Sequence, residues 1–235
     1  MSLAREIRTR LIPKVPQDAG GVSLSLFYKP VIWQGGDYSD VWLGKDGKVV
    51  FAVGKVSDKG LPAAMCMSGL WGLLRTTMSL VDDLSSVMEL VNDRLSPNLS
   101  EGMSVALFLG LFDPATGSLE YINAGHLQPI VLHGNSALAQ LGQTDSPVLG
   151  SEGASFKKNV QNLGKNIQLL VFTDGIINTK SPRGEEFGMK QLVNLLKTAD
   201  DLSAEGLKRL ILKAVEEFCH PCPLQDDITL FSLHT

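Results

Sequence analysis

Apolar and polar residues alternate at several places along the chain. The segment from Val22 to Tyr28 alternates in this way, which is typical of a strand with one buried face. Pairs of apolar runs joined by short polar or glycine-containing turns predict hairpins at residues 40–43 with 49–54, 105–112 with 118–124, and 129–133 with 137–141. Longer apolar runs predict a buried strand at 165–172 and a closing strand at 228–233.

Other segments have the composition and spacing of helices. Residues 61–80 carry Pro62 in the first turn, followed by alanine, methionine and leucine, which favour a helix. Because apolar residues occur all round it, we expect this helix to be buried between layers. Further helices are expected at 84–95, 189–197 and 204–218. Hairpins dominate and helices come in pairs, so the pattern predicts an α+β domain with mainly antiparallel sheets and helices on their outer faces.

The N-terminal segment differs from the rest. Residues 4–13 are basic and amphipathic and end at Pro13, as the tail of a helix would. No linker-like stretch divides the remainder. We therefore expect a helical stub at residues 1–16 and a single domain over residues 17–235.

The composition is that of an ordinary globular domain. Hydrophobic residues make up 44% of the 235 residues and charged residues 20%, and the net charge is −4, so neither nucleic acid nor an anionic membrane is expected as a partner. No apolar run approaches the roughly 20 residues that span a bilayer, and no secretory signal is visible. The three cysteines favour a reducing compartment, so we expect a cytoplasmic protein.

Two of the cysteines stand close together in Cys219-His220-Pro221-Cys222, which has the spacing of half a zinc site. A structural zinc ion needs four ligands, and the sequence offers no second cysteine pair. We interpret this motif as part of the loop before the last strand.

Acidic residues lie at the ends of apolar runs. Asp37 follows two glycines, Asp174 follows the buried strand, and Asp226-Asp227 precede the closing strand. Each is common in turns, but adjacent carboxylates repel each other and are relieved by a nearby cation. Oxygen ligands held at strand ends suit Mg²⁺ or Mn²⁺. A further segment of the same strand-then-turn form carries Lys55 where an acid is expected.

These features belong to a longer series of motifs in a fixed order. They are Leu11-Ile12-Pro13, Gly35-Gly36-Asp37-Tyr38, Val56-Ser57 with Lys59-Gly60 and Pro62-Ala63-Ala64, Asp113-Pro114 with Thr116-Gly117, Tyr121 with Asn123-Ala124-Gly125-His126, Thr173-Asp174-Gly175, Gly184-Glu185-Glu186-Phe187-Gly188 and Asp226-Asp227-Ile228-Thr229. Over nearly its whole length the sequence resembles the bacterial SpoIIE and RsbU branch of the metal-dependent type 2C protein serine/threonine phosphatases.

The resemblance implies two packed antiparallel sheets flanked by helices, with two Mn²⁺ or Mg²⁺ ions at one edge. In that family the ions share a water that supplies hydroxide for attack on phosphoserine or phosphothreonine. By motif match, the carboxylates of Asp37, Asp174 and Asp227 would be metal ligands and catalytic residues, and the backbone carbonyl of Val56 a further ligand. Asn123 and His126 match a family signature, and we expect them to be structural.

Lys55 departs from the family pattern, which has a metal-bridging aspartate there. A protonated amine has no lone pair and cannot bridge cations, so the hydroxide would lose its support. Asp58, which stands where the pattern has glycine, is a candidate for compensation because it lies three residues beyond Lys55.

Three interpretations remain open. The chain is a phosphatase, weakened by Lys55, that acts on a phosphorylated regulatory protein such as an anti-sigma-factor antagonist. Alternatively, it is a pseudophosphatase that serves as a protein-binding adaptor module of a response regulator. Either would be joined through the N-terminal helix to an upstream receiver or sensor domain. In the third interpretation, Lys55 forms a structural ion pair with Asp37 or Asp174 and nothing binds there.

Overall fold

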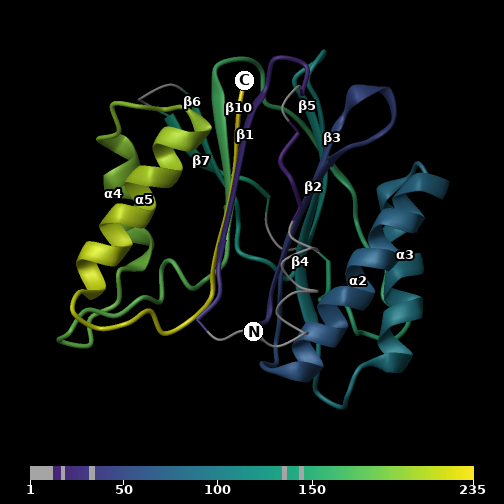
Figure 1. The fold of residues 1–235 in the computed structure, drawn as a ribbon. Coiled ribbons are helices and arrows are strands. Elements are labelled where there is room, and N and C mark those ends of the chain that lie inside the picture. Colours follow the sequence, from purple (N-terminus) through teal and green to yellow (C-terminus); the bar gives the residue numbers. More distant parts are fainter. Residues whose placement is uncertain (1–12, 17–18, 32–34, 134–136, 143–145) are drawn as a thin grey trace.

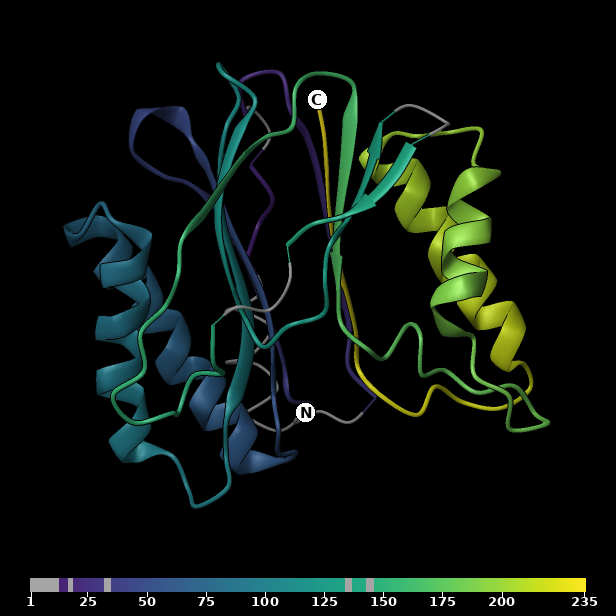
Figure 2. The ribbon, with the colours of Figure 1, turned by 180° about the vertical axis from the view of Figure 1, so that it is seen from behind.

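The computed structural model describes residues 13–16, 19–31, 35–133, 137–142 and 146–235. Within them, two five-stranded antiparallel sheets pack face to face, and a pair of helices covers the outer side of each (Figures 1 and 2). This arrangement confirms the expected α+β class with two packed antiparallel sheets flanked by helices.

The two sheets are called sheet A, with strand order β1-β10-β9-β6-β7, and sheet B, with order β2-β3-β4-β5-β8. The strands of sheet A are β1 (Ser23–Lys29), β6 (Ile130–His133), β7 (Ala137–Gln140), β9 (Ile167–Phe172) and β10 (Ile228–His234). The strands of sheet B are β2 (Asp37–Leu43), β3 (Val49–Val56), β4 (Val105–Asp113), β5 (Ser118–Ala124) and β8 (Asn159–Asn162). The covering helices are α2 (Leu61–Leu80) and α3 (Leu84–Leu95) on sheet B, and α4 (Gly188–Lys197) and α5 (Ala204–Cys219) on sheet A. Short 3-10 helices occur at Lys45–Gly47 and Ser96–Asn98.

Strand β3 supplies two cores at once. Phe51 and Val53 are fully buried between the sheets, whereas Val50 and Ala52 belong to the core beneath α2 and α3. This follows because successive side chains of a strand point to opposite faces. The ring of Phe51 stacks on Phe231 of β10 with 4.5 Å between ring centroids, a contact that adds about 1 kcal/mol beyond its buried area. The central core therefore fixes the two sheets against each other.

The outer helices each bury one face. On α5 the buried residues Leu207, Ile211 and Val215 recur every four positions, so they form a single stripe, and α5 packs on β1 and β10. Helix α2 was expected to be buried between layers, and this prediction was wrong. It is an outermost element (Figure 1), with Met65 66% and Leu61 53% exposed, because only its side toward sheet B and α3 has packing partners.

The expected strands and helices are confirmed, with ends that differ by a few residues. Strand β8 was not predicted, since Asn159–Asn162 has three polar residues and an exposed Val160, and it joins sheet B through backbone pairing with β5. The expected helical segment at residues 4–12 and the turn at Gly134-Asn135 lie outside the described residues. In the described part of the chain, no helix combines the length and hydrophobicity needed to cross a bilayer.

The acidic segments meet at one end of the two sheets. Asp37 begins β2 and pairs with Lys55 near the end of β3. Asp174 comes two residues after β9, and Asp226 and Asp227 come directly before β10, which pairs with β9. Antiparallel neighbours bring the end of one strand beside the start of the next, so carboxylates far apart in the sequence become neighbours here.

Candidate functional site

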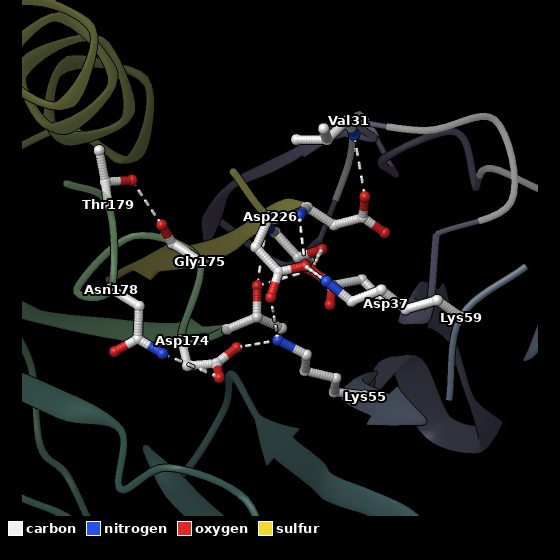
Figure 3. Close-up of polar contacts among 12 residues, drawn as sticks. Val31, Asp37, Lys55, Lys59, Asp174, Gly175, Asn178, Thr179 and Asp226 are labelled. Carbon is white, nitrogen blue, oxygen red and sulfur yellow. Dashed lines mark hydrogen bonds and ion pairs between the residues drawn. The ribbon is translucent and has the colours of Figure 1, made fainter. Parts of the chain in front are cut away.

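The carboxylates of Asp174 and Asp226, called here the outer pair, both bind Lys55. The Lys55 Nζ atom donates to Asp174 Oδ1 and, at 2.8 Å, to Asp226 Oδ2. Lys59 Nζ also donates to Asp226, at Oδ1 and 3.1 Å. Figure 3 shows the amine of Lys55 between the two carboxylates, with Lys59 approaching Asp226 from the other side. One ammonium group thus compensates two negative charges that come from different strand ends.

Lys55 and Asp226 stabilise each other's charged forms. Burial alone would lower the pKa of Lys55, but the hydrogen bonds and charges of Asp174 and Asp226 outweigh it and raise the pKa to about 12. Burial alone would raise the pKa of Asp226, yet its bonds to Lys55 and Lys59 keep that pKa below its usual value. At neutral pH the lysine is therefore positive and Asp226 is negative.

The carboxylates of Asp37 and Asp227 are called here the inner pair, and each of these residues is 3% exposed. Asp37 Oδ2 accepts hydrogen bonds from the hydroxyls of Thr173 at 2.6 Å and Thr229 at 2.7 Å. Asp227 Oδ1 accepts from the backbone amide of Val31 at 2.9 Å. Burial raises the pKa of Asp37 to about 7, helped by the charge of Asp227 and opposed by the two hydroxyls and by Lys55. The inner pair is thus stabilised mainly by neutral donors.

Two glycines allow this close packing. A Cβ atom on Gly35 would collide with the carboxylate of Asp227, and one on Gly36 would lie 2.7 Å from the Asp58 carbonyl and 3.1 Å from the Val56 carbonyl. The Gly36 carbonyl in turn accepts from the Val56 amide at 2.8 Å. The Gly-Gly sequence before Asp37 is therefore required by the approach of the backbone to the inner pair and to β3.

The remaining predicted site residues lie around these pairs. Asp174 Oδ2 accepts from the side-chain amide of Asn178 at 3.1 Å (Figure 3). The Val56 carbonyl lies beside Gly36, as above. Asp58 is exposed, and its carboxylate accepts from the Lys59 amide at 2.7 Å. Within the described residues, no hydrogen bond or ion pair connects Asp58 with the outer pair, so its side chain is turned toward its own backbone.

Asn123 and His126 have mainly structural contacts. Asn123 Oδ1 accepts from the His126 amide at 2.8 Å, and His126 Nδ1 lies 3.0 Å from the Leu127 carbonyl, to which it donates as the Nδ1–H tautomer. The pKa of His126 falls to about 4 because the ring is buried, while the charges of Asp174 and Lys55 act on it in opposite directions. The ring is therefore neutral, as a residue that orders a turn would be.

The residues present do not fit a two-metal centre. Lys55 occupies the space between the carboxylates of the outer pair, and a protonated amine offers no lone pair to a cation. Among the residues that the structure describes, no group of three or more histidine, cysteine or acidic side chains is arranged to hold a metal ion. The chemistry of the donor set is that of an internal ion pair.

Sequence reasoning named Asp226 in the acidic segment before the closing strand but gave the ligand role to Asp227 and none to Asp226. The structure brings together Asp174 with Lys55, and Asp37 with Asp227, whereas Val56 contributes backbone beside Gly36. Of the adjacent acids, Asp226 faces Lys55 and Asp227 turns inward to Val31. The pairing of two acids before β10 was the available signal, because consecutive side chains at the start of a strand point in opposite directions.

The comparisons with known proteins agree with this fold. The family model described as Stage II sporulation protein E (SpoIIE) matches residues 45–235. The chain is 24% identical to Protein IcfG of Synechocystis sp. (strain ATCC 27184 / PCC 6803 / Kazusa) over 257 aligned positions, which cover 98% of this chain and 40% of that protein. It is 25% identical to phosphoserine phosphatase RsbU of Bacillus subtilis (strain 168) over 235 positions, which cover 96% and 67%. The chain thus spans 40% and 67% of the lengths of these two relatives.

Solved structures share the architecture. The SiaA-PP2C domain of Pseudomonas aeruginosa superposes with a TM-score of 0.82 at 16% identity, and the match covers 99% of this chain and 93% of that one. RsbX in complex with magnesium superposes with a TM-score of 0.68 at 15% identity, covering 94% and 98%. At these identities the likeness concerns the fold.

Proposed function

Since the chain belongs to the Stage II sporulation protein E (SpoIIE) family, whose model covers residues 45–235, we propose that it is a pseudophosphatase of the type 2C fold. In this proposal it binds a regulatory protein of bacterial stress or sigma-factor signalling and does not hydrolyse phosphoserine at a significant rate. The observation that carries the proposal is the Lys55 amine, which binds the carboxylates of both Asp174 and Asp226.

Lys55 supplies the positive charge of a metal ion but cannot activate water as a metal ion does. Mn²⁺ or Mg²⁺ in the related phosphatases would activate a water as nucleophile. An ammonium group screens the same carboxylates but has no coordination site for water. With its pKa at about 12, it remains charged at neutral pH and does not release the outer pair. The shape of the domain is kept while the nucleophile is lost.

Kinship supports the choice of partner. RsbU of Bacillus subtilis is described as a phosphoserine phosphatase. The resemblance of this chain to the SpoIIE and RsbU branch suggests that the protein recognised here is an anti-sigma-factor antagonist or a similar phosphorylated regulator. A receiver or sensor domain upstream in the full-length protein is part of this proposal and fits the adaptor role. Both relatives are longer than the region matched here.

A second candidate is a weakened metal-dependent phosphatase. It is favoured by one observation: Asp227 Oδ2 is buried without a hydrogen bond in the described part of the chain. The carboxylate of Asp227 lies against Gly35 and the Val56 carbonyl against Gly36, so oxygen donors of the kind that Mn²⁺ prefers remain besides the outer pair.

A phosphatase assay separates the two. The chain is incubated with millimolar Mn²⁺ and either p-nitrophenyl phosphate or a phosphoserine peptide, and we expect release of product equal to the blank. Turnover above the blank that a chelator abolishes would establish the weakened phosphatase instead. Isothermal titration with Mn²⁺ should show no tight two-site binding.

Substitutions locate the cause. Lys55→Asp, alone and combined with Asp58→Gly, should bring Mn²⁺ binding and product release above the wild type, because the amine between the outer carboxylates is replaced by an oxygen donor. Lys59→Asp is the matched control, since it makes the same charge change beside Asp226 but leaves Lys55 in place. A gain with Lys59→Asp equal to that with Lys55→Asp would contradict the assignment.

A further inference from the structure

Two cysteines lie at the C-terminal end of helix α5 and in the loop that follows, outside the phosphatase-like site. Cys219 is the last residue of α5 and is buried, and Cys222 follows in the loop and is partly exposed. The loop continues to Asp226 and then enters β10. Both side chains are free thiols.

The backbone holds the two residues together. The Cys222 amide donates to the Cys219 carbonyl at 2.7 Å, which closes a four-residue turn. In such a turn the first and last Cα atoms lie within about 7 Å, and a disulfide spans Cα separations of about 4.4–6.8 Å. These two ranges overlap, so the turn keeps the cysteines near the separation that a disulfide spans.

We propose that Cys219 and Cys222 form a reversible thiol–disulfide site that is oxidised by low-molecular-weight disulfides. The partly exposed Cys222 thiolate attacks a disulfide RSSR, forms a mixed disulfide and releases one RS⁻. The Cys219 thiolate then attacks the Cys222 sulfur, which forms the internal disulfide and releases the second RS⁻. Two protein thiols are oxidised, two molecules of RSH are produced, and the two thiol protons end on them.

Differential alkylation tests this. The native chain is incubated with excess oxidised glutathione at mildly alkaline pH, freed of reagent, unfolded and treated with iodoacetamide before peptide mass spectrometry. We expect Cys219 and Cys222 to escape alkylation in a linked peptide lighter by two hydrogen atoms, and dithiothreitol to restore both to alkylation. Cys66 is the internal control: it is buried in α2, burial raises its pKa to about 11, and it should be alkylated in every sample.

Single variants separate the two steps. In Cys219→Ser the glutathione adduct on Cys222 should persist, because no second thiol resolves it, whereas Cys222→Ser should carry little adduct on the buried Cys219. Circular dichroism confirms that each variant is folded. Alkylation of both cysteines in the oxidised wild type, or a stable glutathione adduct on wild-type Cys222, would overturn the proposal. Neither outcome depends on whether the domain hydrolyses phosphoserine.

Discussion

The outer and inner carboxylate pairs lie at the same end of the two sheets but are stabilised by different interactions. Asp174 and Asp226 are partly exposed and share the ammonium group of Lys55. Asp37 and Asp227 are buried and accept hydrogen bonds from threonine hydroxyls and a backbone amide. The ammonium group of Lys55 neutralises charge in the outer pair. In the inner pair, neutral donors form hydrogen bonds and the pKa of Asp37 is raised. Their responses to mutation, salt and pH should differ accordingly.

The largest effect is expected from breaking the inner pair. Asp37→Ala removes the oxygen that accepts both the Thr173 and Thr229 hydroxyls, and leaving buried donors without an acceptor costs about 3 kcal/mol in total. Urea unfolding of variant and wild type measures this free energy. Asp37→Asn is the control, because its carbonyl oxygen keeps the acceptor and should limit the loss to about 1 kcal/mol. Equal losses in the two variants would show that the hydroxyl bonds do not matter.

Breaking the outer pair should have a smaller effect. Lys55→Met leaves Asp174 without a cation and Asp226 with Lys59 alone. Since the side chains of Asp174 and Asp226 are 34% and 26% exposed, water relieves part of the penalty, and we expect a loss of about 2 kcal/mol in unfolding free energy. High salt should reduce this loss by screening, but not that of Asp37→Ala. Lys59→Met, at an exposed ion pair to the same Asp226, should cost no more than about 0.5 kcal/mol. A loss there as large as at Lys55 would contradict the distinction.

The smallest effect concerns His126 near the outer pair. Its folded-state pKa of about 4 lies below the unfolded value of about 6.5, so on acidification the unfolded chain takes up a proton before the folded chain does. Stability from this group is present above about pH 6.5 and is lost as the pH falls toward 4. Between about pH 6.5 and pH 5 the loss amounts to about 1.5 kcal/mol. Over this range the unfolding free energy of His126→Gln should therefore fall by about 1.5 kcal/mol less than that of the wild type. Parallel pH profiles of the two proteins would refute the assignment.

The layered fold could be predicted from local patterns, because buried apolar residues recur along the sequence with the period of a strand or a helix. The alternation from Val22 to Tyr28 predicted β1, and apolar runs flanking short turns predicted hairpins such as β4 with β5. Where side chains face water, the period disappears: Asn159–Asn162 joins sheet B through backbone bonds that any residue can make, so β8 was missed. The outward face of α2 was misjudged because Met65 and Leu61 are apolar yet exposed.

The candidate site was predictable as a set of residue types and less so as a geometry. Motif order placed Asp37, Asp174 and Lys55 in one cluster, and strand pairing brings them there. Which of two adjacent acids faces outward depends on the direction in which the chain enters β10, and this is set by packing of Asp227 against Gly35. Likewise, the side chain of Asp58 turns to the Lys59 amide, a local choice that no spacing rule reveals.

The Lys55 amine is covalently part of the chain, so the positive charge between Asp174 and Asp226 is always present at the same local concentration. The fold of such a domain would not depend on bound manganese and would be kept at low metal concentration or in the presence of a chelator. Under the proposed function, binding of a partner would then be independent of the supply of trace metals.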